Sequence, residues 1–300
     1  MSATPQVLTT DHLSAARQRE VFEAAHVACI NDGATPLSEE TLLRLDAQPT
    51  RPAPWRHLLV DGPDGLVGYA HLDQSDPTAP WAELFVLPRN RLGGIGGALW
   101  HELHAIAPNV RVWAHGFLPV AAEFGRARGL RVVRELWQMA RPLEDIPATG
   151  RPLPPGYTIT TYSPDDERDE RDWLAVNAAA FVHHPEQGRI DARALRARQA
   201  EPWFDPAGFF LVRAGAGNGA AFHGTKVEQG SGVVYVVGVH PDRQGLGLGA
   251  AVTAHGLRHL RDLGLSRVSL YVDGDNEAAI ATYRRLGFER VGLDVQLAAD

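Results

Sequence analysis

The stretch Val233–Ala250, with the sequence VVYVVGVHPDRQGLGLGA, decides the fold. Its apolar, β-branched first part predicts a strand, and the pattern over Ala250–Leu260 predicts a helix that begins after the glycines. Glycines at a helix N-terminus leave the unpaired N–H groups of the first turn open to an anion, because no side chain blocks the approach. The stretch therefore predicts a strand, a tight turn and a helix that together bind a phosphate-bearing ligand.

The spacing of the glycines narrows the choice of ligand. A P-loop has Lys and then Ser or Thr after its last glycine, where this chain has Ala250–Ala251, and a dinucleotide fingerprint has a different glycine spacing. Gln244–Gly249 instead resembles the Gln/Arg-x-x-Gly-x-Gly signature of the GCN5-related N-acetyltransferases. The resemblance implies that this turn holds the pyrophosphate of acetyl-CoA. On six residues alone, a glycine turn without a ligand is the alternative interpretation.

A second motif lies thirty residues downstream. Asn276–Phe288 resembles the closing motif of the same family, Asn-x-x-Ala-x-x-x-Tyr-x-x-x-Gly-Phe. Asn276 is a suitable N-cap, and Gly287 is a suitable end for the helix. The resemblance implies that Tyr283 of this helix is the acid that protonates the departing thiolate. The two motifs together identify the chain as a member of the family.

Length and composition suit a globular protein that acts on small molecules. The 300 residues suggest two domains of about 150 residues each. A net charge of −7, without a long basic run, argues against nucleic-acid partners. We expect a cytoplasmic protein with no membrane contact, because the sequence has neither a signal peptide nor an 18-residue apolar run. We also expect a monomer. We expect no metal, because the helically spaced histidine pairs lack a third ligand.

The chain contains an internal repeat. Arg91–Gly96 has the Arg-x-x-Gly-x-Gly pattern, and Gly94 precedes its counterpart Gly247 by 153 residues, about half of the chain. Such an offset indicates a duplicated domain. Where the second copy has Tyr283, the first has Gly125. We therefore expect an N-terminal acetyltransferase-like domain, 1–141, that keeps the phosphate cradle without catalysis.

The second copy, 157–300, is then the catalytic acetyltransferase domain. The intervening 142–156 is rich in proline and predicts a stiff linker. We expect an α+β fold of two tandem GCN5-related N-acetyltransferase domains, each with a mixed, mostly antiparallel central sheet flanked by helices. In each, antiparallel strands precede a helix, a strand, a helix and a final hairpin.

Further motifs narrow the resemblance to the mycothiol synthase family, over nearly the whole chain. These motifs are Trp113–Gly116, Arg134–Met139, His184–Gly188, Trp203–Phe209 and Phe222–Val227. The resemblance implies acetyl transfer from acetyl-CoA to the cysteine amine of cysteinyl-glucosaminyl-inositol, the final step of mycothiol biosynthesis.

The same resemblance implies the binding residues. The acceptor would contact Glu39, Glu186, Lys226 and Tyr271. The reactive acetyl-CoA would contact Val237, Gly238, Val239, Gln244, Gly245, Leu246, Gly247, Leu248, Gly249, Ala250, Asn276, Glu277, Ala278, Ala279, Ile280 and Ala281. The first cradle would consist of Leu84, Phe85, Val86, Arg91, Gly93, Gly94, Ile95 and Gly96. Two cradles allow one acetyl-CoA per domain.

The sequence departs from the family at two positions. Val233 stands where the family has the Glu taken as general base, and Gly224 stands where it usually has Trp. We hypothesise that Glu228 supplies the missing carboxylate, because a hairpin turning at 229–232 would place it opposite Val233. We expect Gly224 to widen the pocket.

These departures leave two alternatives to a mycothiol synthase. One is an acetyltransferase for another small amine. The other is a non-catalytic acetyl-CoA-binding protein, against which Asn276 and Tyr283 argue.

Overall fold

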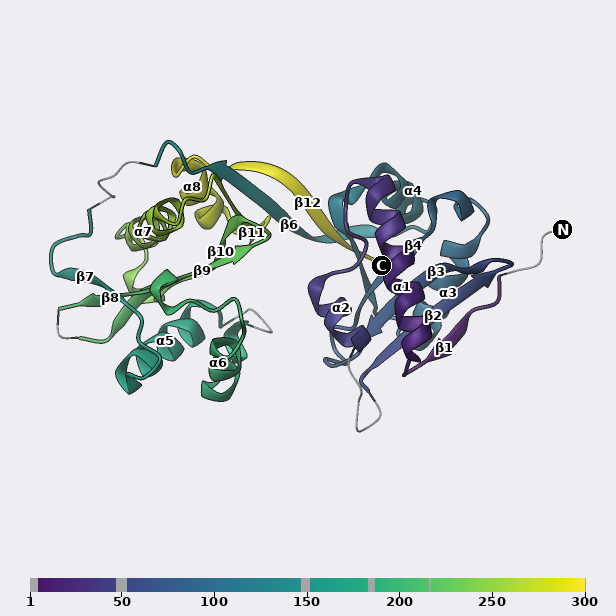
Figure 1. The fold of residues 1–300 in the computed structure, drawn as a ribbon, viewed down its shortest axis with the longest axis horizontal. Helices are drawn as coiled ribbons and strands as arrows, with labels where there is room; N and C mark the ends of the chain where they lie inside the picture. Colours follow the sequence, from purple (N-terminus) through teal and green to yellow (C-terminus); the bar gives the residue numbers. More distant parts are fainter. Residues whose placement is uncertain (1–4, 47–52, 147–151, 183–186, 216, 300) are drawn as a thin grey trace. The chain divides into compact units, whose positions relative to one another are not determined.

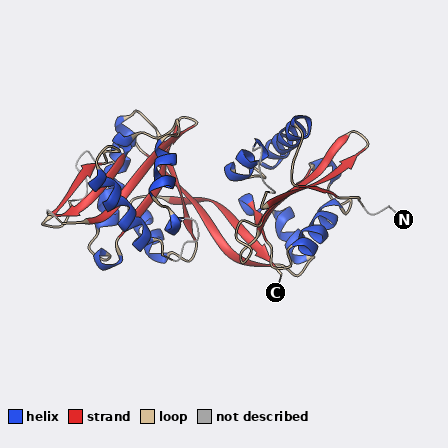
Figure 2. Cartoon of the chain, turned by 90° about the horizontal axis from the view of Figure 1, so that it is seen from below, coloured by secondary structure: helices blue, strands red, loops and turns tan. Residues whose placement is uncertain are grey.

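The computed structural model describes residues 5–46, 53–146, 152–182, 187–215 and 217–299. The chain divides into two compact units, Met1–Leu136 with Gly292–Asp300, and Trp137–Val291. Each unit has strands of one mixed sheet with helices on both faces (Figures 1 and 2). The predicted fold class, α+β with a mostly antiparallel sheet in each half, is confirmed. The predicted linker 142–156 falls partly outside the described residues.

The first unit contains six adjacent strands. In sheet order they are β1 (Leu8–Thr10), β2 (Trp55–Gly62), β3 (Gly65–Asp73), β4 (Trp81–Val86), β5 (Arg111–Ala114) and the end of β12 (Glu289–Ala298). Only β4 and β5 pair in parallel; the other pairs are antiparallel. The helices are α1 (Ala15–Asp32), α2 (Glu39–Asp46), η1 (Pro88–Asn90), α3 (Ile95–Ile106), η2 (His115–Phe117) and α4 (Pro119–Arg126).

Helices cover both faces of this sheet. On one face, α1 packs against Tyr69 and Phe85, and on the other, Leu99 and Leu103 of α3 pack against the side chains that alternate with these. Strand β3 is buried along nearly its whole length for this reason. Helix α3, which lies between β4 and β5 in the chain, is therefore packed against the sheet through Leu99 and Leu103.

The second unit repeats the arrangement. In sheet order its strands are the end of β6 (Arg131–Pro142), β11 (Arg267–Asp273), β10 (Ser231–Val239), β9 (Gly219–Glu228), β8 (Phe209–Ala214) and β7 (Tyr157–Thr161). β10 and β11 are parallel, as β4 and β5 are. The helices are α5 (Glu167–Ala180), η3 (Gln187–Arg189), α6 (Ala192–Gln199), η4 (Pro206–Gly208), η5 (Pro241–Arg243), α7 (Leu248–Asp262) and α8 (Glu277–Arg285).

The predicted final hairpin is wrong. After α8 the chain forms the single strand β12, whose end pairs with β5, Val295 opposite Ala114. Val295 is fully buried there, and Leu297 is almost so. The last strand of the chain therefore completes the sheet of the first unit, because its apolar side chains find a core there.

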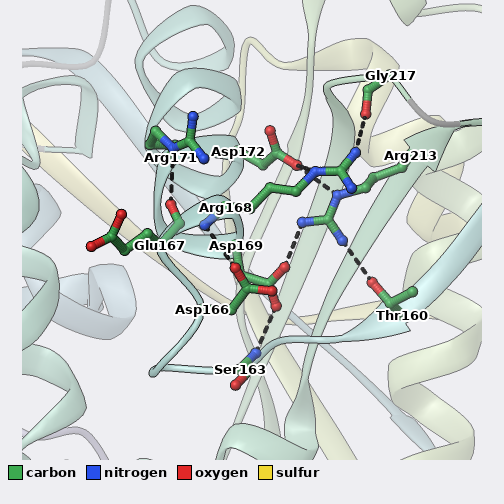
Figure 3. A network of polar contacts seen from close by, with 10 residues as sticks. All are labelled: Thr160, Ser163, Asp166, Glu167, Arg168, Asp169, Arg171, Asp172, Arg213 and Gly217. Carbon is green, nitrogen blue, oxygen red and sulfur yellow. Dashed lines mark hydrogen bonds and ion pairs between the residues drawn. The ribbon is translucent and has the colours of Figure 1, made fainter.

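A buried ionic network fixes α5 on the sheet of the second unit (Figure 3). The guanidinium of Arg213, on β8, donates to Asp172 at 2.6 Å and to Asp169 at 2.5 Å, both on α5. It also donates to Thr160 of β7 at 3.0 Å. Asp169 accepts a further hydrogen bond from the backbone N–H of Ser163. One arginine thus joins two strands and a helix in the interior.

Candidate active site

The two glycine turns have the same geometry. Gly94 is the N-cap of α3 with φ of 85°, and Gly247 is the N-cap of α7 with φ of 80°. Both adopt the left-handed conformation that glycine takes without steric cost, and a 3₁₀ turn starting at Pro88 or Pro241 precedes each. Neither helix has a side chain capping its first turn. Each N-terminus therefore offers unpaired N–H groups to an anion.

The strand before each turn separates from its parallel neighbour. In the described part of the chain, β10 pairs with β11 only through Gly232–Val268 and Val233–Ser269. Likewise β4 pairs with β5 over only three residue pairs, ending at Glu83–Trp113. Beyond these pairs, the edges of Leu84–Val86 and Val237–Val239 no longer meet a parallel strand. An extended chain such as pantetheine can hydrogen-bond there.

Helix α8 begins as the sequence predicts. The side chain of Asn276 accepts a hydrogen bond from the N–H of Ala279 at 3.1 Å, which caps the helix. At the other end, the Arg141 guanidinium donates to the carbonyl of Leu286. Both ends of the helix that carries Tyr283 are therefore held in place.

Tyr283 is partly buried and packs against the core of the second unit. Its ring meets Phe288 edge-on, with 5.8 Å between the ring centroids. Burial raises the pKa of the Tyr283 hydroxyl to about 12. The hydroxyl therefore carries its proton at neutral pH and can donate it.

A cavity of about 410 Å³ extends from the first glycine turn. Of the residues predicted for the first cradle, all except Gly93 line it: Leu84, Phe85, Val86, Arg91, Gly94, Ile95 and Gly96. The side chains of Val112–Ala114 and of α4 complete the wall. The first unit thus has room for a ligand where the repeat predicts one.

The first unit has no hydroxyl in the place of Tyr283. Gly125 stands there in the repeat, and a Cβ added to it would lie 3.2 Å from Cδ1 of Leu297. Leu118, the counterpart of Asn276, is the N-cap of α4 and makes no side-chain capping hydrogen bond. Leu297, an apolar side chain of β12, therefore packs beside the position that corresponds to Tyr283 in the repeat.

A buried cluster around His115 also lies at this cavity, and sequence reasoning missed it. His115 Nε2 lies 2.8 Å from Glu83 Oε1, and its Nδ1 lies 3.1 Å from Asp294 Oδ2. Glu83 also accepts from the backbone N–H of Ser38. Burial alone would lower the pKa of His115, but the bonds to Asp294 and Glu83 outweigh it and raise the pKa to about 9. The only sequence signal was His115 within the motif Trp113–Gly116.

Three other histidines are buried and neutral. Burial lowers the pKa of His57 to about 4, and those of His71 and His223 to about 3. The unfolded chain, with histidine pKa near 6.5, therefore binds protons before the folded chain does. Stability falls as the pH drops below 6.5 toward these folded values. For His115 the sign is opposite, because its pKa is raised in the folded chain. The stability that its protonated form contributes is lost as the pH rises through about 9.

We predict that His223→Leu flattens the acid limb of the stability curve. Between pH 7.5 and 5, the unaltered chain should lose about 2 kcal/mol through His223. Urea unfolding at several pH values measures this slope. His26→Leu, at an exposed position of α1, is the matched control and should leave the slope unchanged. Equal slopes for the His223 variant and the unaltered chain would contradict the prediction.

The register of β9 and β10 differs from the predicted one. Gln229 and Gly230 both have positive φ, 49° and 78°, and form a two-residue turn. Glu228 is therefore opposite Ser231, and Lys226 is opposite Val233. The prediction that Glu228 faces Val233 directly is wrong, because that pairing requires a four-residue loop. Glu228 lies diagonally from Val233 on the same face.

The prediction that Gly224 widens the pocket is also wrong. A Cβ at Gly224 would lie 2.6 Å from Cε1 of Phe209, so the phenyl ring already fills the space. Phe209 is opposite Gly224 in the pairing of β8 with β9.

The other predicted acceptor residues have separate places. Glu39 is the first residue of α2 in the first unit. Lys226 is on β9, and Tyr271 is a half-exposed residue of β11, both in the second unit. Glu186 lies outside the described residues.

None of the described helices is long and apolar enough to span a membrane.

Known proteins resemble the chain throughout. The model of the acetyltransferase (GNAT) family matches residues 161–288. A solved GCN5-related N-acetyltransferase from Sphaerobacter thermophilus superposes with a TM-score of 0.76, at 23% identity, over 98% of this chain and 96% of its own. This structural similarity supports the tandem GCN5-related N-acetyltransferase fold.

Two relatives resemble the sequence more closely. The mycothiol acetyltransferase of Salinispora arenicola is 49% identical over 95% of this chain and 94% of its own. That of Catenulispora acidiphila is 47% identical over 92% of both chains. The family predicted from the motifs is thereby confirmed, and the chain belongs to the mycothiol acetyltransferases, a family of tandem GCN5-related N-acetyltransferases.

Proposed function

We propose that the chain transfers the acetyl group of acetyl-CoA to the cysteine amine of cysteinyl-glucosaminyl-inositol and so completes mycothiol. The observation that carries this is the second unit, which combines the glycine turn at α7 with Tyr283 on a capped α8. The relatives named mycothiol acetyltransferase, at 43–49% identity, support the choice of acceptor. We further propose a cytoplasmic monomer whose partners are small molecules.

The chemistry needs three things from the protein. The acceptor amine must be neutral to attack the thioester, the carbonyl oxygen needs a hydrogen-bond donor, and the departing thiolate needs a proton. The backbone N–H of Val239, or of a neighbour, is the oxyanion donor, because β11 no longer pairs with that part of β10. Tyr283 gives its proton to the sulfur of coenzyme A.

The acceptor carries an ammonium group and many hydroxyls before reaction. A carboxylate at Glu186 suits its charge, and Lys226 and Tyr271, both in the second unit, can bind its oxygens. No acid stands at position 233, so the amine loses its proton to water or arrives neutral. Turnover should therefore follow the titration of the acceptor amine itself, near pH 8 for an α-amino group.

Acetyl-CoA turnover by the purified chain tests this function. Thiol release is followed with cysteinyl-glucosaminyl-inositol and with a panel of simple amines. We expect rapid turnover with the mycothiol precursor alone. Turnover confined to another amine would assign a different acceptor, and binding without any turnover would support the non-catalytic alternative.

We also propose that the first unit binds acetyl-CoA without transferring it. The cavity at Gly94 supports binding, and Leu297 beside Gly125 supports the absence of transfer, since no hydroxyl can protonate the thiolate there. The N-terminal domain, 1–141 by sequence, would then act as a structural coenzyme site. The catalytic domain is the one that carries Tyr283.

We predict two acetyl-CoA molecules per chain by equilibrium dialysis, and one after either Gly94→Asp or Gly247→Asp. Each glycine is the N-cap of its helix, so a carboxylate there repels the coenzyme phosphates. Asp tolerates the left-handed conformation better than most residues, which limits the strain. The two substitutions are controls for each other, and the double variant should bind none. A single site in the unaltered chain that Gly94→Asp leaves intact would contradict two-site binding.

A further inference from the structure

Lys226, near the end of β9, contacts Glu228 and Trp203. Its Nζ lies 2.9 Å from Oε1 of Glu228 and 5.4 Å from the centroid of the Trp203 ring. The Lys226 side chain is 11% exposed, whereas that of Glu228 is 46% exposed. Trp203 in turn packs on Tyr235, with 4.7 Å between the ring centroids. The ammonium therefore lies between an aromatic wall and a carboxylate that is open to water.

The strand register explains why Glu228 matters in this chain. Lys226 is directly opposite Val233, and opposed side chains share one face of the sheet. An acid at position 233, as in the family pattern, would meet this ammonium across the strands. Val233 offers it no charge. Glu228, two residues beyond Lys226 on the same strand, points to the same face and provides the carboxylate instead.

We propose that Glu228 is a positioning residue, which holds the Lys226 ammonium against Trp203 so that it can bind the acceptor. The inference rests on the proposed function. A lysine side chain has four rotatable bonds, and fixing it by a charge-assisted hydrogen bond removes the freedom that acceptor binding would otherwise have to remove. In this proposal Glu228 orients the lysine and abstracts no proton.

The turn makes this arrangement rigid. Gln229 and Gly230, both with positive φ, form the two-residue connection that fixes the pairing of β9 with β10. Glu228 is the last residue before this turn, so the pairing of the two strands fixes its position relative to Lys226 and Val233. Because its carboxylate is half-exposed, water screens the pair, and its contribution is modest.

Acceptor kinetics of Glu228→Gln test the proposal. We expect KM for the acceptor to rise about fivefold, the upper end for a screened ion pair, with kcat and the KM for acetyl-CoA retained. In a Lys226→Gln background, Glu228→Gln should not change the acceptor KM further. Adding Val233→Glu to Glu228→Gln should restore the acceptor KM, because that acid faces Lys226 directly. Asp262→Asn, which removes an exposed ion pair with Arg261 on α7, is the matched control.

Three outcomes would overturn the proposal. The first is independent effects of the Glu228 and Lys226 substitutions on the acceptor KM. The second is a fall in kcat with loss of the acidic limb of the pH profile in Glu228→Gln, which would make Glu228 a base. The third is a Glu228→Gln variant identical to an active unaltered chain. An unaltered chain that acetylates no amine would instead refute the proposed function.

Discussion

Replacing Tyr283 with Phe should lower kcat by roughly 10²-fold or more, with little change in the affinity for acetyl-CoA, if this residue protonates the thiolate. The partly buried ring can keep its packing against Phe288 in the variant, so we expect the fold to be retained. Only the hydroxyl is lost, and with it the proton that makes coenzyme A a good leaving group. Steady-state thiol release and acetyl-CoA dialysis measure the two quantities.

The size of this effect depends on what replaces the hydroxyl. Water is a poor substitute in the apolar surroundings that raise the pKa of Tyr283 to about 12. The high pKa also predicts that Tyr283 itself does not produce an alkaline limb below pH 10. Tyr157→Phe, which removes a hydroxyl from the edge strand β7, is the matched control and should change kcat less than twofold. Wild-type kcat in Tyr283→Phe would assign the proton to another donor.

Local sequence signals predicted the elements that carry the site. The glycine turns and the cap at Asn276 depend on neighbouring residues, and the structure has each of them. The residues that the repeat offset predicted for the first cradle, apart from Gly93, line the cavity of the first unit. Such features follow from backbone preferences that a short window of sequence contains.

Contacts between distant residues could not be predicted in this way. His115 and Asp294 are 179 positions apart, and the pairing of β12 with β5 joins the end of the chain to the first unit. The Glu228 register failed for a different reason, because one turn type fixes which residues face each other. Phe209 in the space beside Gly224 depends on a neighbouring strand. Such contacts are set by packing, not by local pattern.

Replacing Arg213 with Met should destabilise the second unit by about 3–5 kcal/mol, because it leaves buried Asp169 without its cation and Asp172 with only the longer contact to Arg168, at 3.9 Å. The methionine fills much of the volume of the arginine stem, so the loss is electrostatic more than steric. Arg171→Met, at an exposed position on the same helix α5, is the matched control and should change stability by less than about 0.5 kcal/mol. Urea unfolding at pH 7 measures both.

Neutralising one of the two carboxylates tests whether the loss of stability in Arg213→Met comes from charge or from packing. Asp172→Asn in the Arg213→Met background should recover part of the lost stability, since an amide is cheaper to bury than an unpaired carboxylate. Asp169 is the less suitable choice, because it also accepts the N–H of Ser163. If Asp172→Asn instead adds to the loss, the network stabilises α5 through hydrogen-bond geometry rather than through charge balance.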